Sequence, residues 1–549
     1  MKKLNIILGS LALGALMAFT SCESLDQTPK DYFASTTFWQ DAAQVSGYMT
    51  GLNSYLRSSY GDNFLMGEIR GGLLGDGDDG TGVSVFGESM YAQTIIKQDL
   101  REDNALFNNW NSIYSYIVRV NLAIQQIPNC SFLTDKEKAL YLAEAYGMRA
   151  YYYFFLYRTW GNVPLVTDVA ITEGEVSAAA LSRPRSNASE IMKLMKQDID
   201  ESEAQYKAAG SNGWQDQYNW SLYATLILKA NIYAWAAEVT TGDQTATGTA
   251  DLRTAKTALQ TIISSGKFKL MPQFYQAFRS DFKDQNTENI LAAPFNQTDK
   301  VYFPNISYAL SQANFFTAAY DLNNKPLKLD KTQTYGTYTL INGIVRYQYK
   351  ESFWRSFDAT DTRRDATFFP VKGNPDKEAT GSNFGVLVPK FAGTYSTSEG
   401  THYLDDDGPI FRYAEVLLLM AEIENDLGND PSSYINEIRQ RAYYGSTYTP
   451  YTNKSKYENT KAILFESDKE FVFEGKRWFN LIRMKDASGQ SLVFDPSVNY
   501  PFIPGAMGSE GAILSSSDAY KVLWPLSTST MNNDPALTQT AGYKTAFTR

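Results

Sequence analysis

The stretch TDKEKALYLAEAYGMRAYYYFFLYR, residues 134–158, decides the fold. It opens with Thr134 and Glu137, which have the spacing of a capping box. In that motif the two side chains bond free amides of the first helical turn reciprocally. The sequence therefore predicts a helix through this whole stretch, ending before Gly161 and Pro164, which disfavour its continuation.

Other predicted helices lie on both sides of this one. Residues 104–127 place Trp110, Tyr114 and Ile117 three or four positions apart, which is typical of one helical face. Two helices joined by a short turn form a helical hairpin. Further helical segments are predicted at 189–208, 221–239, 251–264, 409–427, 431–442 and 462–484.

The segment 409–427 carries its own start signal. Pro409 suits a first helical turn, where its missing N–H would have no partner in any case. Asp407 is then the expected N-cap, and Asp405 and Asp406 place further negative charge near the positive end of the helix dipole. We interpret these three aspartates as capping residues.

Helical hairpins in series predict a mainly α fold of the divergent helical-repeat kind, in which each pair buries a face on its neighbours. No strict 34-residue consensus is present, so this prediction depends on pattern alone. Between residues 266 and 405 the pattern changes to short apolar runs between polar and aromatic residues. This segment is predicted to be loop-rich with short strands, and such loops on a rigid scaffold commonly carry binding residues.

The N-terminus has the pattern of a bacterial lipoprotein signal. A basic start precedes the apolar run Leu4–Phe19, and small residues lead to Cys22. We expect residues 1–21 to be removed and Cys22 to carry at least two acyl chains, which stable anchoring requires. The apolar run is shorter than the roughly 20 residues of a spanning helix. The alternative is an ordinary secretory signal with an incidental cysteine.

Composition excludes several functional classes. The net charge is −10 and the pI is near 5.0, which argues against nucleic-acid binding through cationic contacts. His402 is the sole histidine and lies in no recognisable motif, so a His-dependent triad or zinc site is not expected. Because Cys22 is used by the anchor, Cys130 is left alone and no intrachain disulfide is expected.

Several ordered motifs together resemble the SusD/RagB-like family of outer-membrane nutrient-binding lipoproteins. Each motif is weak by itself, and PIFRYAEVLL at 409–418 is the most specific. Two departures are Ser467-Asp468-Lys469, where the family usually has two arginines, and Trp160, where tyrosine is common. The other motifs are LDQTP (25–29), RAYYYF (149–154), GNVPL (161–165), INEIRQRA (435–442), EFVFEGKRWFNL (470–481), WPL (524–526) and NDPAL (533–537).

The resemblance implies a fold built on tetratricopeptide-like hairpins, with an N-terminal helical region at 22–240 and a C-terminal region at 241–549. It implies a lipid-anchored protein on the outer face of the outer membrane. Such proteins pair with a SusC-like TonB-dependent transporter and pass it a captured nutrient, most often an oligosaccharide. They resemble one another in being binding proteins and not enzymes, and no cofactor is required.

Flat aromatic side chains beside polar groups suit a sugar, which has an apolar face and a rim of hydroxyls. Trp354, with Phe353 beside it, lies in the loop-rich region and is the leading candidate platform, and packing within the loop is the alternative. Trp214, in a loop before a helix, is the second candidate. We expect the other seven tryptophans in the scaffold or core: Trp39, Trp110, Trp160, Trp220, Trp235, Trp478 and Trp524.

The acidic segment GDGDDG, residues 75–80, is the remaining candidate site. Asp76, Asp78 and Asp79 could accept sugar hydroxyls or help to bind Ca²⁺, which prefers oxygen ligands. The spacing is not that of an EF-hand, because Glu88 falls one position late and the required glycine is absent. The alternative is a solvated acidic turn.

Two other functional classes remain open from the residues alone. A surface glycoside hydrolase would need two carboxylates roughly 5–10 Å apart, and no motif indicates such a pair. A scaffold whose helical hairpins bind a peptide or protein would also fit the helical pattern. Arg363-Arg364-Asp365 is interpreted as a structural ion pair and not as a ligand clamp.

Overall fold

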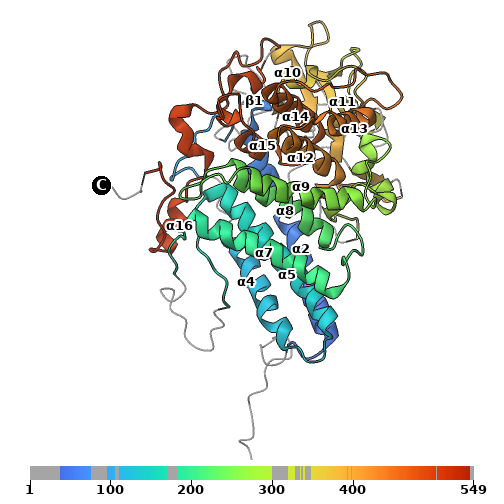
Figure 1. Ribbon diagram of the computed structural model, residues 1–549. Helices are drawn as coiled ribbons and strands as arrows, with labels where there is room; N and C mark the ends of the chain where they lie inside the picture. The colour runs from blue at the N-terminus through green and yellow to red at the C-terminus, as the bar shows by residue number, and fades with distance from the viewer. Residues whose placement is uncertain are drawn as a thin grey trace, which may run out of the picture.

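The computed structural model describes residues 38–75, 95–105, 110–169, 182–298, 319–327, 334–335, 338–339, 348–391, 393–396, 398–502 and 504–544. Helices dominate these residues and confirm the predicted mainly α fold (Figure 1). Successive helices of the N-terminal half pack side by side, from α4 through α5, α7 and α8 to α9, and α2 packs on α4. Their bounds are α2 (Ala42–Gly67), α4 (Trp110–Gln126), α5 (Asp135–Trp160), α7 (Ala188–Ala209), α8 (Leu222–Glu238) and α9 (Thr249–Ser264).

The start of α5 follows the capping-box prediction. The Thr134 hydroxyl accepts a hydrogen bond from the Glu137 amide at 3.3 Å, and the Glu137 carboxylate accepts one from the Thr134 amide at 2.8 Å. The helix ends where Gly161 adopts a φ of 72°, a conformation that favours glycine. Local sequence signals therefore set both ends of this helix.

Most helices of the C-terminal half lie together in the upper part of Figure 1, and α16 lies at the left edge of the molecule. The single helix predicted at 462–484 is two helices, because Phe473 and Gly475 have φ values of 65° and 69° and turn the chain back between them. The helices here are α10 (Glu351–Arg355), α11 (Thr362–Thr367), α12 (Tyr413–Asp426), α13 (Ser432–Ala442), α14 (Lys456–Glu470), α15 (Arg477–Arg483) and α16 (Thr528–Asn533).

Short strands form small antiparallel sheets, as predicted for the loop-rich segment. β11 (Gly408–Arg412) pairs with β2 (Asn289–Ala293), and β7 (Phe369–Lys372) lies between β3 (Tyr320–Asp321) and β8 (Phe384–Leu387). The other pairs are β1 (Leu74–Gly75) with β6 (Gln348–Tyr349), β4 (Thr334–Tyr335) with β5 (Tyr338–Thr339), and β9 (Thr394–Ser396) with β10 (Thr401–Tyr403).

The predicted start of the 409–427 helix is wrong. Pro409 lies in β11, and α12 begins only at Tyr413. The aspartates before it are buried and bind distant groups instead of capping a helix: Asp406 accepts the amides of Ser280 and Gly393, each at 2.8 Å. Asp407 pairs with Lys283 at 2.8 Å.

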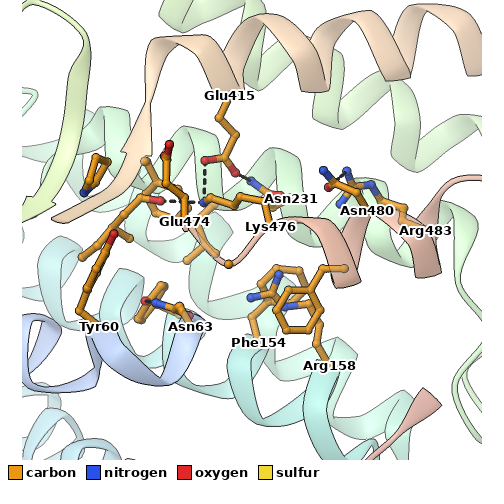
Figure 2. Close-up of a pocket in the computed structure, with 17 residues that line it drawn as sticks. Tyr60, Asn63, Phe154, Arg158, Asn231, Glu415, Glu474, Lys476, Asn480 and Arg483 are labelled. Carbon is orange, nitrogen blue, oxygen red and sulfur yellow. Dashed lines mark hydrogen bonds and ion pairs between the residues drawn. The ribbon is translucent and has the colours of Figure 1, made fainter. Parts of the chain in front are cut away.

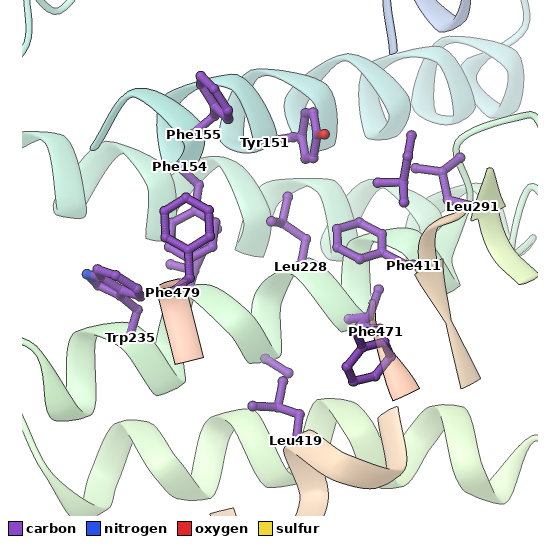
Figure 3. Close-up of a cluster of buried hydrophobic side chains, with 14 of the residues drawn as sticks. Tyr151, Phe154, Phe155, Leu228, Trp235, Leu291, Phe411, Leu419, Phe471 and Phe479 are labelled. Carbon is purple, nitrogen blue, oxygen red and sulfur yellow. The ribbon is translucent and has the colours of Figure 1, made fainter. Parts of the chain in front are cut away.

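The apolar core lies where α5, α8, α12 and α15 meet (Figure 3). Trp235 contacts Phe154 edge-to-face with ring centroids 6.0 Å apart, and contacts Phe479 at 6.2 Å. Six of the seven tryptophans assigned to the scaffold are buried here or nearby: Trp110, Trp160, Trp220, Trp235, Trp478 and Trp524. The exception, Trp39, is only half-buried.

A buried ion network joins the strands to the last helices. Arg412 pairs with Glu288 at 2.7 Å, Glu470 at 2.6 Å and Glu474 at 2.8 Å. Arg363 pairs with Asp361, Glu466 and Glu470 while only 1% of its side chain is exposed, which confirms its interpretation as a structural residue. At the position where the family motif departs, Asp468 pairs with Arg477 in the interior.

Candidate functional site

The strand pair β1–β6 brings two predicted ligand-binding segments to one place. Gly75 lies opposite Gln348 in the register, and the Lys350 amide donates to the Leu73 carbonyl at 2.8 Å. The acidic segment leaves directly from the end of β1, and α10, with Phe353 and Trp354, follows directly after β6. Asp76, Asp78 and Asp79 themselves lie outside the described residues, so their binding role stays a prediction.

A buried lysine fixes the surroundings of this strand pair. Lys350 Nζ donates to the Tyr500 carbonyl at 2.7 Å and to Asn499 Oδ1 at 3.3 Å, and Glu510 lies 3.5 Å away. A Cβ on Gly75 would overlap the ring of Phe502, so the segment after residue 499 packs closely on β1. The strand pair is therefore a rigid base from which the acidic segment begins.

Phe353 cannot serve as a ligand platform, and its prediction as a binding residue is wrong. The side chain is fully buried, with its ring centroid 5.1 Å from that of Tyr500 and 5.8 Å from that of Phe368. Stacking on a sugar requires an exposed ring face. The sequence signal was misleading because α10 is short and its burial depends on residues far along the chain.

Trp354 is 9% exposed and packs within the protein, as the alternative interpretation expects. Its ring centroid lies 5.2 Å from that of Phe384, and the guanidinium carbons of Arg355 and Arg364 lie 5.3 and 5.6 Å from the same ring. These neighbours leave little of the ring for a ligand. The structure therefore favours a packing role for Trp354.

Trp214 lies half-buried in the connection between α7 and α8. Its ring contacts Phe268 edge-to-face at 4.9 Å and Tyr223 at 6.0 Å, and Lys267 Nζ lies 4.6 Å from the ring centroid. These ring neighbours come from α8 and from the segment after α9, not from the β1–β6 region. A binding role for Trp214 stays a separate prediction.

A groove between α2 and α4, which we call the aromatic groove, was missed by the sequence analysis. It has a volume of about 880 Å³, within the ~300–1,000 Å³ of small-ligand pockets. Trp39 lies 4.8 Å from Tyr48 between ring centroids, and Arg119 lies 5.2 Å from the ring of Tyr55. The available signal was the recurrence of aromatic residues at 38, 39, 48 and 55, with Gly47 and Gly51 between them. A Cβ at either glycine would have no neighbour within 4 Å, so the groove floor is open.

A second hollow, which we call the Arg158 cavity, lies inside the protein between α5, α8, β11 and the α14–α15 turn (Figure 2). Its volume is only about 50 Å³, too small for a sugar ring. Lys476 pairs with Glu415 at 2.8 Å there, and Asn231 donates to the same carboxylate at 3.2 Å. The guanidinium of Arg158 lines the same cavity.

The described residues show neither a metal site nor a membrane-spanning helix. They hold no group of three or more His, Cys, Asp or Glu side chains placed to bind a metal ion. Among their helices, none combines the length and the apolar character needed to cross a bilayer.

Comparisons with known proteins now add to this geometry. A family model described as the SusD family matches residues 233–543, and one described as starch-binding associating with outer membrane matches residues 76–240. Since the first match alone covers more than half of the chain, the protein belongs to the SusD family. The recognition made from the motifs is thereby confirmed.

Two of the individual relatives agree over nearly the full length, and a third agrees over a shorter stretch. A SusD-like protein (P38) of Formosa agariphila is 26% identical over 525 residues, which cover 89% of this chain and 93% of the relative. The crystal structure of a SusD superfamily protein from Bacteroides fragilis superposes with a TM-score of 0.79 at 29% identity, covering 92% of this chain and 100% of that one. The starch-binding protein SusD of Bacteroides thetaiotaomicron is 30% identical over 142 residues, or 26% of this chain and 22% of that protein.

Proposed function

We propose that this protein is a non-enzymatic surface lipoprotein that captures a glycan and passes it to a SusC-like TonB-dependent transporter. The observation that carries the proposal is the paired family match, which runs from residue 76 to residue 543 without a gap. The description of the N-terminal match names both starch binding and the outer membrane. The 76–240 match also begins at Asp76, so it includes the acidic segment.

The predicted anchor would hold this activity at the outer membrane. Cys22 would hold the chain in the outer membrane, and 15 residues (23–37) separate it from the described fold at Phe38. Fully extended, such a tether spans roughly 50 Å. The variant Cys22→Ala is expected to leave the membrane fraction, while wild-type protein on intact cells is accessible to added protease. Retention of the variant in the membrane would contradict the anchor.

Ligand binding is tested first on wild-type protein. Calorimetry against a panel of oligosaccharides and peptides is expected to give binding to one glycan class and none to peptides. A reducing-sugar assay on the same glycan is expected to show no product. Peptide binding alone would favour the scaffold alternative, and sugar release would favour the hydrolase.

The acidic segment is tested by charge removal. The triple variant Asp76→Asn, Asp78→Asn, Asp79→Asn is expected to weaken glycan binding at least tenfold, since hydrogen bonds to a charged group contribute about 1.5–3 kcal/mol each. The control Asp135→Asn changes an exposed carboxylate at the start of α5 and should bind normally. Chelation of Ca²⁺ should leave wild-type binding unchanged if the carboxylates contact the sugar directly. Unchanged binding by the triple variant would remove the acidic segment from the site.

A further inference from the structure

Arg158 has an unusual position in the internal cavity. Its guanidinium carbon lies 4.1 Å from the ring centroid of Phe154 and 3.9 Å from that of Phe479, and Figure 2 shows Arg158 beside Phe154. Aromatic rings stacked on a guanidinium stabilise its two faces by cation–π attraction. They do not accept hydrogen bonds from its N–H groups. Those donors lie in the guanidinium plane and still need acceptors.

The described groups around this guanidinium supply no acceptor. Across the part of the chain that the structure describes, Arg158 forms no hydrogen bond or ion pair, and its Nε is buried without a partner. Neighbouring cations are already matched: Lys476 pairs with Glu415 at 2.8 Å, and Arg483 pairs with Glu422 at 2.6 Å. The charge of Arg158 is therefore left without a direct counter-charge.

That charge persists at neutral pH. Burial lowers the pKa of Arg158 to about 9, which is still well above 7. A buried charge without a partner is costly, and proteins normally compensate it with an opposite charge. An ion from solution can do this where the protein does not.

The size and polarity of the cavity restrict what could enter. A volume of about 50 Å³ is several times the ~10–15 Å³ that one water needs, so a small ion with accompanying water fits. Asn480 Oδ1 accepts a hydrogen bond from Arg483 at 3.0 Å. The amide N–H groups of Asn480 have no acceptor among the described residues. Arg158 and Asn480 both line the cavity.

We propose that the Arg158 cavity binds one small monovalent anion of the halide class, chloride in solution, held by the guanidinium edge of Arg158 and the amide of Asn480. The anion would connect α5 to α15 and so link the helical hairpins to the C-terminal half. This site is independent of glycan binding. Water alone in the cavity is the competing outcome.

Two measurements on the full-length wild-type protein test the site. Crystals grown in sodium bromide are expected to give an anomalous scattering peak in the cavity beside Arg158. The melting temperature is expected to rise by about 1–2 °C for each tenfold increase in chloride at constant ionic strength, with gluconate as the replacement anion. No bromide peak, or equal melting temperatures in chloride and gluconate, would overturn the proposal.

Variants assign the effect to this cavity. Arg158→Met removes the donors but keeps an apolar chain between the two rings, and it is expected to abolish the chloride dependence. Arg253→Met, at an exposed position on α9, should retain it. If the first variant fails to fold, Asn480→Ala is the second test. This variant should raise several-fold the chloride concentration that gives half of the increase in melting temperature. A chloride response that survives both cavity variants would place the ion elsewhere and refute the assignment.

Discussion

At the scale of single residues, the buried carboxyl of Glu68 connects segments that are distant in the sequence. It follows α2, and its Oε1 accepts the Phe473 amide and the Tyr349 hydroxyl, both at 3.1 Å. The residue is 1% exposed, and burial raises the pKa of its carboxyl to about 7. Three segments distant in the sequence therefore meet at a group that is protonated in mildly acidic solution.

This residue predicts a pH dependence of stability. Between pH 4.5 and 7 the folded protein keeps a proton that the unfolded chain has lost, so the free energy of unfolding falls as pH rises, by up to about 3 kcal/mol. The glutamine of the Glu68→Gln variant cannot ionise, so the free energy of unfolding of this variant should fall less over the same pH range. Unfolding in guanidinium chloride at pH 5 and at pH 7.5 measures the change in the free energy of unfolding. The variant Glu378→Gln, at an exposed position, is the control. A Glu68→Gln profile parallel to the wild-type profile would show that another group titrates.

At the scale of elements, local signals were sufficient for some predictions and not for others. The capping box at Thr134 predicted α5 because both of its partners lie within one helical turn. Asp407 was taken for a cap because nothing local shows that Lys283 and Tyr218 would bind it. Phe353 was predicted as a binding residue beside Trp354, and nothing in the local sequence shows that Tyr500 and Phe368 bury it. The aromatic groove was missed for the same reason, since two separate helices form it.

The break between α14 and α15 is another tertiary feature, and it can be tested with two glycines. Gly475 has a φ of 69°, and a Cβ there would overlap the backbone of Asn63 in α2. Gly489 has a φ of 84° and nothing within 4 Å of a Cβ. Gly489→Ala should cost about 1–2 kcal/mol for the left-handed backbone alone. Gly475→Ala should cost about 1–3 kcal/mol more, because α2 must move. Denaturant unfolding measures both variants. If the two variants lose the same free energy of unfolding, α2 moves aside without a measurable cost.

At the scale of the whole molecule, the ion network around Arg412 connects elements that the sequence presents as separate. Burial alone would raise the pKa of Glu470, but Arg441, Arg412 and Arg363 hold that pKa far below its usual range. These charges lie on β11, α11, α13 and α14. The motif PIFRYAEVLL identified the family, yet its arginine proves to be the centre of this network. The family therefore followed from motifs, while the ligand site could not, because the motifs that are recognisable are the ones that build the scaffold.

Arg412→Met tests how far the fold depends on this network. The variant leaves Glu288, Glu470 and Glu474 buried with less compensating charge, and losing one partner of a buried pair typically costs about 3–5 kcal/mol. Arg439→Met is the matched control, since Arg439 is 24% exposed and pairs with Glu466 at 2.6 Å, so its loss should cost about 1 kcal/mol or less. Urea unfolding of both variants measures the difference. If Arg412→Met unfolds at the same urea concentration as Arg439→Met, the buried carboxylates are compensated by protonation or by Lys390 and Arg441, and the network is not what holds the strands to the last helices.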